Sequence, residues 1–65
     1  MSAQRTRIRD YVSDHPGVHF NDLTRSLELA PGQVQYHLKK LKRSEAVVEE
    51  SLYCRTHYYT PEYGA

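Results

Sequence analysis

Apolar residues recur at helical spacing in three segments of the first two thirds of the chain. The first segment runs from about Gln4 to Asp14, and its apolar face has the spacing i, i+3, i+4 and i+7 at Ile8, Tyr11, Val12 and His15. Pro16 and Gly17 follow, and a proline disfavours the helical conformation in the residue before it. The pattern therefore predicts one helix that ends in a turn.

A second, shorter helix is predicted from about Asn21 to Glu28. Leu23 and Leu27 stand four residues apart on its apolar face. Asn21 is expected to cap the N-terminus, because its side-chain oxygen can accept from backbone N–H groups one turn ahead. Phe20 precedes the cap and suits a hydrophobic staple.

A third helix is predicted from Pro31 to Arg43 or Ser44. Proline fits the first helical position, where its missing N–H costs nothing. Ala30 before it is a poor cap, because it carries no side-chain acceptor. The apolar stripe of this helix consists of Val34, Leu38 and Leu41.

From Ala46 onward the apolar spacing becomes that of strands. A β-hairpin is expected, with its turn near Tyr53-Cys54-Arg55 and with Val47, Val48 and Leu52 in one strand and Thr56, Tyr58 and Tyr59 in the other. Pro61 ends the second strand because it cannot donate to a ladder. The extended stretch Val18–Phe20 allows a short third strand, and residues 61–65 are expected to form a frayed tail.

The order of elements predicts the fold. Two helices joined by a short turn form a helix-turn-helix unit, and a following hairpin makes it a winged helix. We therefore expect a mainly α fold with a small β-hairpin, which is a winged helix-turn-helix of three helices and a two-stranded wing. With 65 residues, the chain has room for one domain over residues 1–65.

The formal net charge of +1 conceals a segregation of charge along the chain. Residues 31–43 hold four cations and no acid, whereas residues 44–53 hold Glu45, Glu49 and Glu50 and no base. At about 100° per residue, the solvent face of the third helix carries Gly32, Tyr36, Lys39, Lys40 and Arg43, flanked by Gln33 and Gln35. Gln can pair with adenine and Lys with guanine, so this face has the chemistry of a DNA reader.

Several stretches in this order resemble winged helix-turn-helix transcription regulators of the ArsR/MarR-like type, in the form common in archaea. The stretches are Gly17-Val-His-Phe-Asn-Asp-Leu, Leu29-Ala-Pro-Gly-Gln-Val-Gln-Tyr-His-Leu-Lys-Lys-Leu, Val47-Val-Glu-Glu and Arg55-Thr-His-Tyr-Tyr. The resemblance covers about Arg5 to Tyr59. It implies sequence-specific binding to double-stranded DNA, with the third helix in the major groove.

The resemblance also implies roles for particular residues. Base-facing positions correspond to Gln33, Gln35, Tyr36 and Lys39, and phosphate-facing positions to Gly32, Lys40, Arg43 and the wing-tip Arg55. The chain departs from the family pattern at Glu45 and Cys54, where relatives often have Gly, so a wing turn of a different type is expected. Glu49 and Glu50 place acid on the wing, which argues against close contact between the wing and DNA.

Other readings of the residues remain open. A module that docks onto other proteins through a patch of Tyr53, Tyr58 and Tyr63 is the alternative function, and these tyrosines could also pack over the sheet. Cys54 beside Arg55 could be a redox-sensitive thiol or an incidental one.

No cysteine or histidine pair has structural-zinc spacing, and no catalytic constellation is present. The expectations are thus no metal, no cofactor, no enzymatic activity and no small-molecule substrate. Without an apolar run of membrane-spanning length or a secretory signal, we expect a cytoplasmic, nucleoid-associated protein with no membrane partner. The expected partner is double-stranded DNA, and a homodimer is an open possibility.

Overall fold

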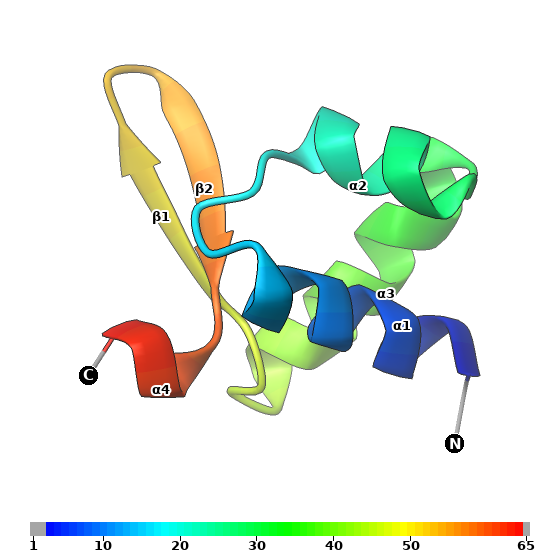
Figure 1. Cartoon of the computed structure of the whole chain (residues 1–65), viewed down its shortest axis with the longest axis horizontal. Helices are drawn as coiled ribbons and strands as arrows, with labels where there is room; N and C mark the ends of the chain where they lie inside the picture. Colours follow the sequence, from blue (N-terminus) through cyan, green and yellow to red (C-terminus); the bar gives the residue numbers. More distant parts are fainter. Residues whose placement is uncertain (1–2, 65) are drawn as a thin grey trace.

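Three helices pack beside a two-stranded hairpin (Figure 1). A computed structural model describes residues 3–64 of the chain. In chain order, its elements are α1 (Ala3–Asp14), α2 (Phe20–Leu27), α3 (Pro31–Arg43), β1 (Val48–Leu52), β2 (Arg55–Tyr59) and α4 (Pro61–Gly64). The predicted fold class is confirmed. The tail was predicted to be frayed, but up to Gly64 it forms the short helix α4.

The turn after α1 connects the helices to the wing. Gly17 has a φ of +86°, a left-handed conformation that glycine adopts at little cost. Its N–H donates to the Tyr58 carbonyl at 2.9 Å, and the Tyr58 N–H donates to the Val18 carbonyl at 3.0 Å. The third strand that the sequence allowed at Val18–Phe20 is therefore a single antiparallel bridge, Val18 to Tyr58.

Helix α2 begins earlier than predicted. Its N-cap is His19, whose side chain makes no capping hydrogen bond, and the predicted cap Asn21 lies inside the first turn. Phe20 at the first helical position packs against the core. Partial burial of the Phe20 side chain offsets the loss of a side-chain cap, which is worth about 1 kcal/mol, so the earlier start carries no net cost. The helix ends at Leu27, because Glu28 adopts the left-handed conformation at φ 55°.

Helix α3 begins at Pro31 as predicted and obtains its cap from an unexpected residue. Ala30 has no side-chain acceptor, but its backbone N–H donates to Gln33 Oε1 at 3.2 Å. The Gln33 side chain thus supplies half of a capping box. At the other end, the Ser44 N–H donates to the Lys40 carbonyl at 3.1 Å and the helix stops.

The hairpin closes through a two-residue turn. Strands β1 and β2 pair antiparallel with Leu52 opposite Arg55, so Tyr53 and Cys54 form the turn. Their φ values are 51° and 65°, as a type I′ turn requires. The wing turn was expected to differ in type without Gly, but it keeps the left-handed geometry, and so does Glu45 at φ 62°.

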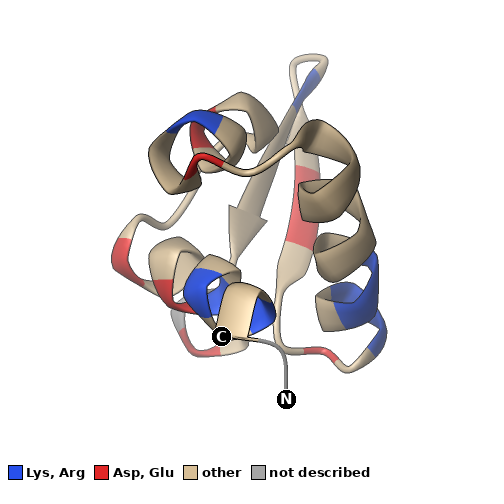
Figure 2. Cartoon of the chain, turned by 90° about the vertical axis from the view of Figure 1, so that its right-hand side faces the viewer, with Lys and Arg blue, Asp and Glu red and all other residues tan. Residues whose placement is uncertain are grey.

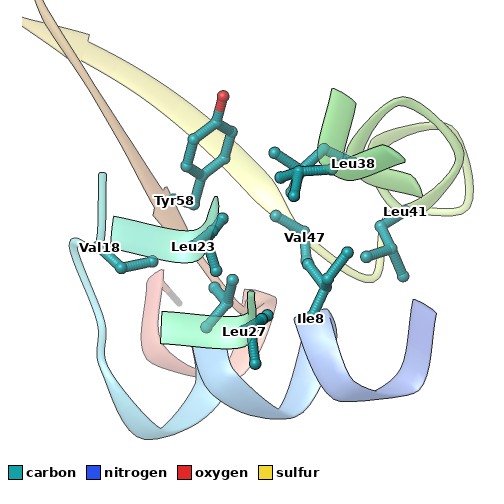
Figure 3. Close-up of a cluster of buried hydrophobic side chains, with 10 residues drawn as sticks. Ile8, Val18, Leu23, Leu27, Leu38, Leu41, Val47 and Tyr58 are labelled. Carbon is teal, nitrogen blue, oxygen red and sulfur yellow. The ribbon is translucent and has the colours of Figure 1, made fainter. Parts of the chain in front are cut away.

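The core lies where the three long helices meet the base of the wing (Figure 3). The predicted apolar stripes are buried, and the cluster consists of Ile8, Val12, Val18, Leu23, Leu27, Val34, Leu38, Leu41, Val47 and Tyr58. One predicted member of the α1 face was wrong, because His15 is exposed beyond the end of the helix. Val48 and Leu52 lie in β1 as predicted, but their side chains are exposed, so the wing reaches the core through Val47 and Tyr58.

The strained turn of the wing yields a prediction for stability. A non-glycine residue in the left-handed region destabilises the folded state by about 1–2 kcal/mol. Glycine avoids this strain, but its greater conformational freedom in the unfolded chain offsets about half of the gain. Replacement of Cys54 by Gly should therefore stabilise the chain by about 0.5–1 kcal/mol and raise Tm by several degrees. Ser51→Gly, in a strand without left-handed backbone, is the control and should destabilise. A Cys54→Gly variant no more stable than the original chain would contradict the strain argument. Thermal unfolding followed by circular dichroism measures both variants.

Candidate nucleic-acid interface

The exposed face of α3 gathers cations around one tyrosine. A shallow hollow of about 190 Å³ is lined by Tyr36, Lys39, Lys40 and Arg43. The Lys40 ammonium lies 5.3 Å from the centroid of the Tyr36 ring, one helical turn away, in a cation–π contact. Figure 2 shows these cations as the blue end of α3, whereas the N-terminal half of the helix carries no charge. This face can receive anionic groups such as phosphates.

A groove separates α3 from the wing. It has a volume of about 490 Å³ and is lined by residues from α2, α3 and both strands: Phe20, Gln35, Leu38, Lys39, Lys42, Glu49, Thr56 and Tyr58. A second depression of about 430 Å³ shares Phe20 and Thr56 with this groove and runs along the start of α2. Arg25 and Arg55 line the second depression from α2 and β2. The two depressions make one surface, which we call the wing groove.

An ion pair and a tyrosine cross the wing groove. Lys42 Nζ donates to Glu49 Oε2 at 3.0 Å, which joins the end of α3 to β1. Burial of Tyr58, together with the negative charge of the neighbouring Glu49 carboxylate, raises the pKa of Tyr58 to about 12. Lys42 and Glu49 thus bridge the end of α3 and the wing at the surface, while Tyr58 attaches the wing to the core.

The structure brings most of the predicted DNA-contacting residues onto one surface. Tyr36, Lys39, Lys40 and Arg43 line the hollow on α3, and Gln35 and Arg55 line the wing groove. Gly32 lies at the exposed start of α3, and a Cβ added there would meet no atom within 4 Å, so its backbone is open to approach. Gln33 is exposed as well, but its Oε1 is engaged by the Ala30 N–H, which leaves its amide donors for a ligand.

Sequence reasoning missed two cations and one amide of the wing groove. Asn21 was assigned only as a helix cap, Arg25 was given no role, and Lys42 lies beside the predicted face of α3. Their positions depend on how α2 and the wing pack against α3. Arg25 is the one Lys or Arg in residues 10–30, where the other charged residues are acids, and this was the one signal in the sequence for its role.

Of the tyrosines that could form a docking patch, Tyr58 is not on the surface. Tyr58 is 6% exposed and belongs to the core, whereas Tyr53 is 96% exposed at the tip of the wing. The side chain of Tyr63 lies outside the described residues. Tyr59 and Tyr11 are half-buried, and the Tyr11 hydroxyl donates a hydrogen bond to Ser26 Oγ at 2.9 Å.

The histidines have structural partners. His19 and His57 lie with ring centroids 4.5 Å apart, and each Nδ1–H donates to a backbone carbonyl, of Thr56 and Gly17 respectively. His37 is buried between α1 and α3, where its Nε2–H donates to Gln4 Oε1 at 3.4 Å. Among residues 3–64, no three His, Cys, Asp or Glu side chains come together as metal ligands.

Within the described residues, no helix has both the length and the apolar character needed to cross a membrane.

A family profile described as HTH_HVO_0163_N, N-terminal HTH domain, matches residues 2–65. Comparison with curated proteins finds no match.

Solved structures share the arrangement of helices and wing. MepR of Staphylococcus aureus, a transcription regulator of the multidrug efflux pump MepA, superposes with a TM-score of 0.86 at 18% identity, over 98% of this chain and 50% of MepR. FabT of Streptococcus pneumoniae, solved in complex with DNA, gives a TM-score of 0.86 at 18% identity, over 98% of this chain and 47% of FabT. The chain thus spans about half the length of these two proteins.

A third structure is matched over nearly its whole length. The Zalpha domain of zebrafish PKZ has a TM-score of 0.82 and 27% identity, over 91% of this chain and 97% of that domain. The three likenesses agree with the winged helix-turn-helix fold described above.

The raised pKa of Tyr58 predicts a loss of stability in alkali. The folded-state pKa of about 12 exceeds the ordinary value of 10.0, so the unfolded chain loses this proton first as pH rises. The resulting stabilisation is fully present below pH 10 and disappears as pH approaches 12, with a size on the order of 2 kcal/mol. Urea unfolding between about pH 9 and pH 12 should show this loss, and Tyr58→Phe should remove it. Tyr53→Phe is the matched control. An equally steep loss in Tyr58→Phe would assign the effect to other groups.

Proposed function

The chain belongs to the family of N-terminal HTH domains whose profile it matches over residues 2–65, and we propose that it binds double-stranded DNA in a transcription regulator. The observation that carries this proposal is the exposed face of α3. It presents Tyr36, Lys39, Lys40 and Arg43 around one hollow without a carboxylate among them. In a helix-turn-helix, this second helix of the unit is the element that enters the major groove.

We assign two kinds of contact to this surface. Gln33, Gln35, Tyr36 and Lys39 lie on the part of α3 that would meet base edges, where Gln suits adenine and Lys suits guanine. Gly32, Lys40 and Arg43 would meet phosphates on either side of the major groove. The function is sequence-specific recognition and not catalysis.

The wing contributes one cation, near its tip. Arg55 follows the turn of the hairpin, and Arg25 of α2 lines the same depression. Because the two side chains come from different elements, both could meet the DNA backbone beside the major groove. We expect the wing to contact DNA only on the side that faces α2, because Glu49 and Glu50 on β1 would repel phosphates.

A finer assignment rests on the resemblance of the sequence to winged helix-turn-helix regulators, and the likeness to MepR and FabT is consistent with the fold that it implies. MepR is a transcription regulator and FabT is seen with DNA, although at 18% identity both inform the fold alone. We propose a regulator of the ArsR/MarR-like type in its archaeal form, acting on DNA in the cytoplasm. Two copies would read two half-sites about one helical turn apart, and light scattering during gel filtration measures whether the chain is dimeric.

The alternative function is docking onto proteins through a tyrosine patch, and one residue of that patch is not available at the surface. Tyr58 is buried, so an exposed patch on the wing would consist of Tyr53 together with Val48 and Leu52 of the edge strand. DNA binding is favoured because the cations gather on α3 and not on the wing.

Binding to DNA should depend steeply on salt. With a duplex of random sequence, fluorescence anisotropy should give a negative slope of log affinity against log salt, of roughly 0.9 for each phosphate contacted. Lys40→Gln should weaken binding to all sequences and flatten the slope by about 0.9, because it removes one phosphate contact. Arg9→Gln is a charge-matched control, since Arg9 lies on α1 and pairs with Asp10. No binding at low salt by the original chain would refute the proposed function.

Replacement of a base-facing residue should have a different signature. After selection of preferred sites from a randomised duplex library, Gln35→Ala should relax the preference at one base position, at a cost of about 1–3 kcal/mol. The salt slope should stay as in the original chain, because no charge is removed. If Gln35→Ala kept the full base preference, Gln35 would have no part in reading the sequence.

A further inference from the structure

One carboxylate lies between α3 and the wing, in a part of the wing groove where the other charged side chains are cations. Glu49 comes from β1, and the other charged side chains that line this part of the groove are Lys39 and Lys42 of α3. The distance of 3.0 Å between Lys42 Nζ and Glu49 Oε2 is that of a charge-assisted hydrogen bond. Glu49 thus meets Lys42 as an anionic oxygen of a phosphate would.

Tyr58 is the neighbour of Glu49 across the hairpin. The two residues pair in the register of the strands, and the Glu49 carboxylate contributes to the raised pKa of the Tyr58 hydroxyl. Tyr58 is itself a core residue, so its hydroxyl is fixed by packing and not by a flexible side chain. In Figure 3 the hydroxyl of Tyr58 points away from the cluster of apolar side chains. The register of the hairpin therefore places Glu49 beside the end of α3, within reach of Lys42.

The neighbouring cations of α3 are not engaged in this way. Among the described residues, the salt bridges are Arg9 with Asp10 and Lys42 with Glu49. Within the same residues Lys39 has no carboxylate partner, and Lys40 lies over the Tyr36 ring. Of the cations on α3, Lys42 alone has its charge balanced within residues 3–64.

We propose that Glu49 competes with DNA phosphate for Lys42, so that Lys42 adds to DNA binding only when Glu49 is displaced. This inference rests on the proposed function and concerns its regulation by a residue of the wing. The side chains of Lys42 and Glu49 are 39% and 37% exposed, and ion pairs with that much solvent contribute little to stability. A phosphate can therefore replace Glu49 without disrupting the fold. While Lys42 is paired with Glu49, it does not contact phosphate, so binding to DNA of random sequence uses one cation fewer.

The test compares single and double substitutions on a random-sequence duplex over a salt series. Glu49→Gln should raise affinity roughly three- to tenfold at low salt and steepen the salt slope by about 0.9, because Lys42 gains a phosphate. In the original background, Lys42→Gln should lower affinity less than Lys39→Gln does, since Lys39 has no ion pair to break among residues 3–64. In the Glu49→Gln background, Lys42→Gln should cancel the gain.

Glu50→Gln is the matched control. It removes the same charge from the next residue of β1, which points to the opposite face of the hairpin and pairs with His57. If Glu50→Gln steepened the slope as much as Glu49→Gln, the effect would be one of net charge, and the proposal would be wrong. Equal losses from Lys42→Gln in both backgrounds would also overturn it.

Two further readouts separate the possible failures. Far-UV circular dichroism establishes whether each variant is folded. If Glu49→Gln is unfolded, the test is the comparison of Lys42→Gln with Lys39→Gln, and equal losses of DNA affinity in these two variants overturn the proposal. Absence of DNA binding by the original chain at low salt would refute the proposed function and this inference with it. Binding by the original chain without a gain in Glu49→Gln would refute the inference alone.

Discussion

The attachment of the wing to the helices depends on Tyr58. Its backbone makes two hydrogen bonds with the turn after α1, from Gly17 and to Val18, and its ring is buried in the core. Its hydroxyl meets Glu49, which in turn pairs with Lys42 at the end of α3. One residue of β2 therefore joins α1, the core, β1 and α3. A 65-residue chain buries only about 60% of its unfolded surface, so few other contacts fix the angle between wing and helix.

The fold could be predicted from the sequence because its signals are periodic and local. The stripe of Val34, Leu38 and Leu41 is buried as its spacing indicates, and Pro31 begins α3. The errors occurred where a tertiary contact outweighed a local preference. Asn21 is a good cap in isolation, but burial of Phe20 starts α2 earlier, and Tyr53 and Cys54 adopt a glycine-like turn because the register of β1 and β2 demands it.

The candidate site was predictable in part for the same reason. The face of α3 follows from helical geometry alone, so the spacing of Tyr36, Lys39, Lys40 and Arg43 was enough to place them together. The wing groove depends on how the elements pack, and no spacing in the sequence relates Arg25 to Arg55 or Lys42 to Glu49. The burial of Tyr58 could not be predicted either, because a tyrosine fits the sequence pattern of a strand whether its ring faces the core or the solvent.

Charge arrangement explains why a net charge of +1 is compatible with a polyanionic partner. Local potential, and not the total, steers a polyanion to a surface. The acids of the described residues lie on α1, α2, α4 and β1 and in the turns, whereas α3 is free of them. If the chain binds DNA as proposed, its few cations allow only a handful of phosphate contacts, so its non-specific affinity should be modest. Discrimination would then depend more on base contacts by α3 and on the number of copies bound than on bulk attraction. The proposed competition of Glu49 for Lys42 would strengthen that dependence, because it subtracts charge from the phosphate contacts, which carry no sequence information.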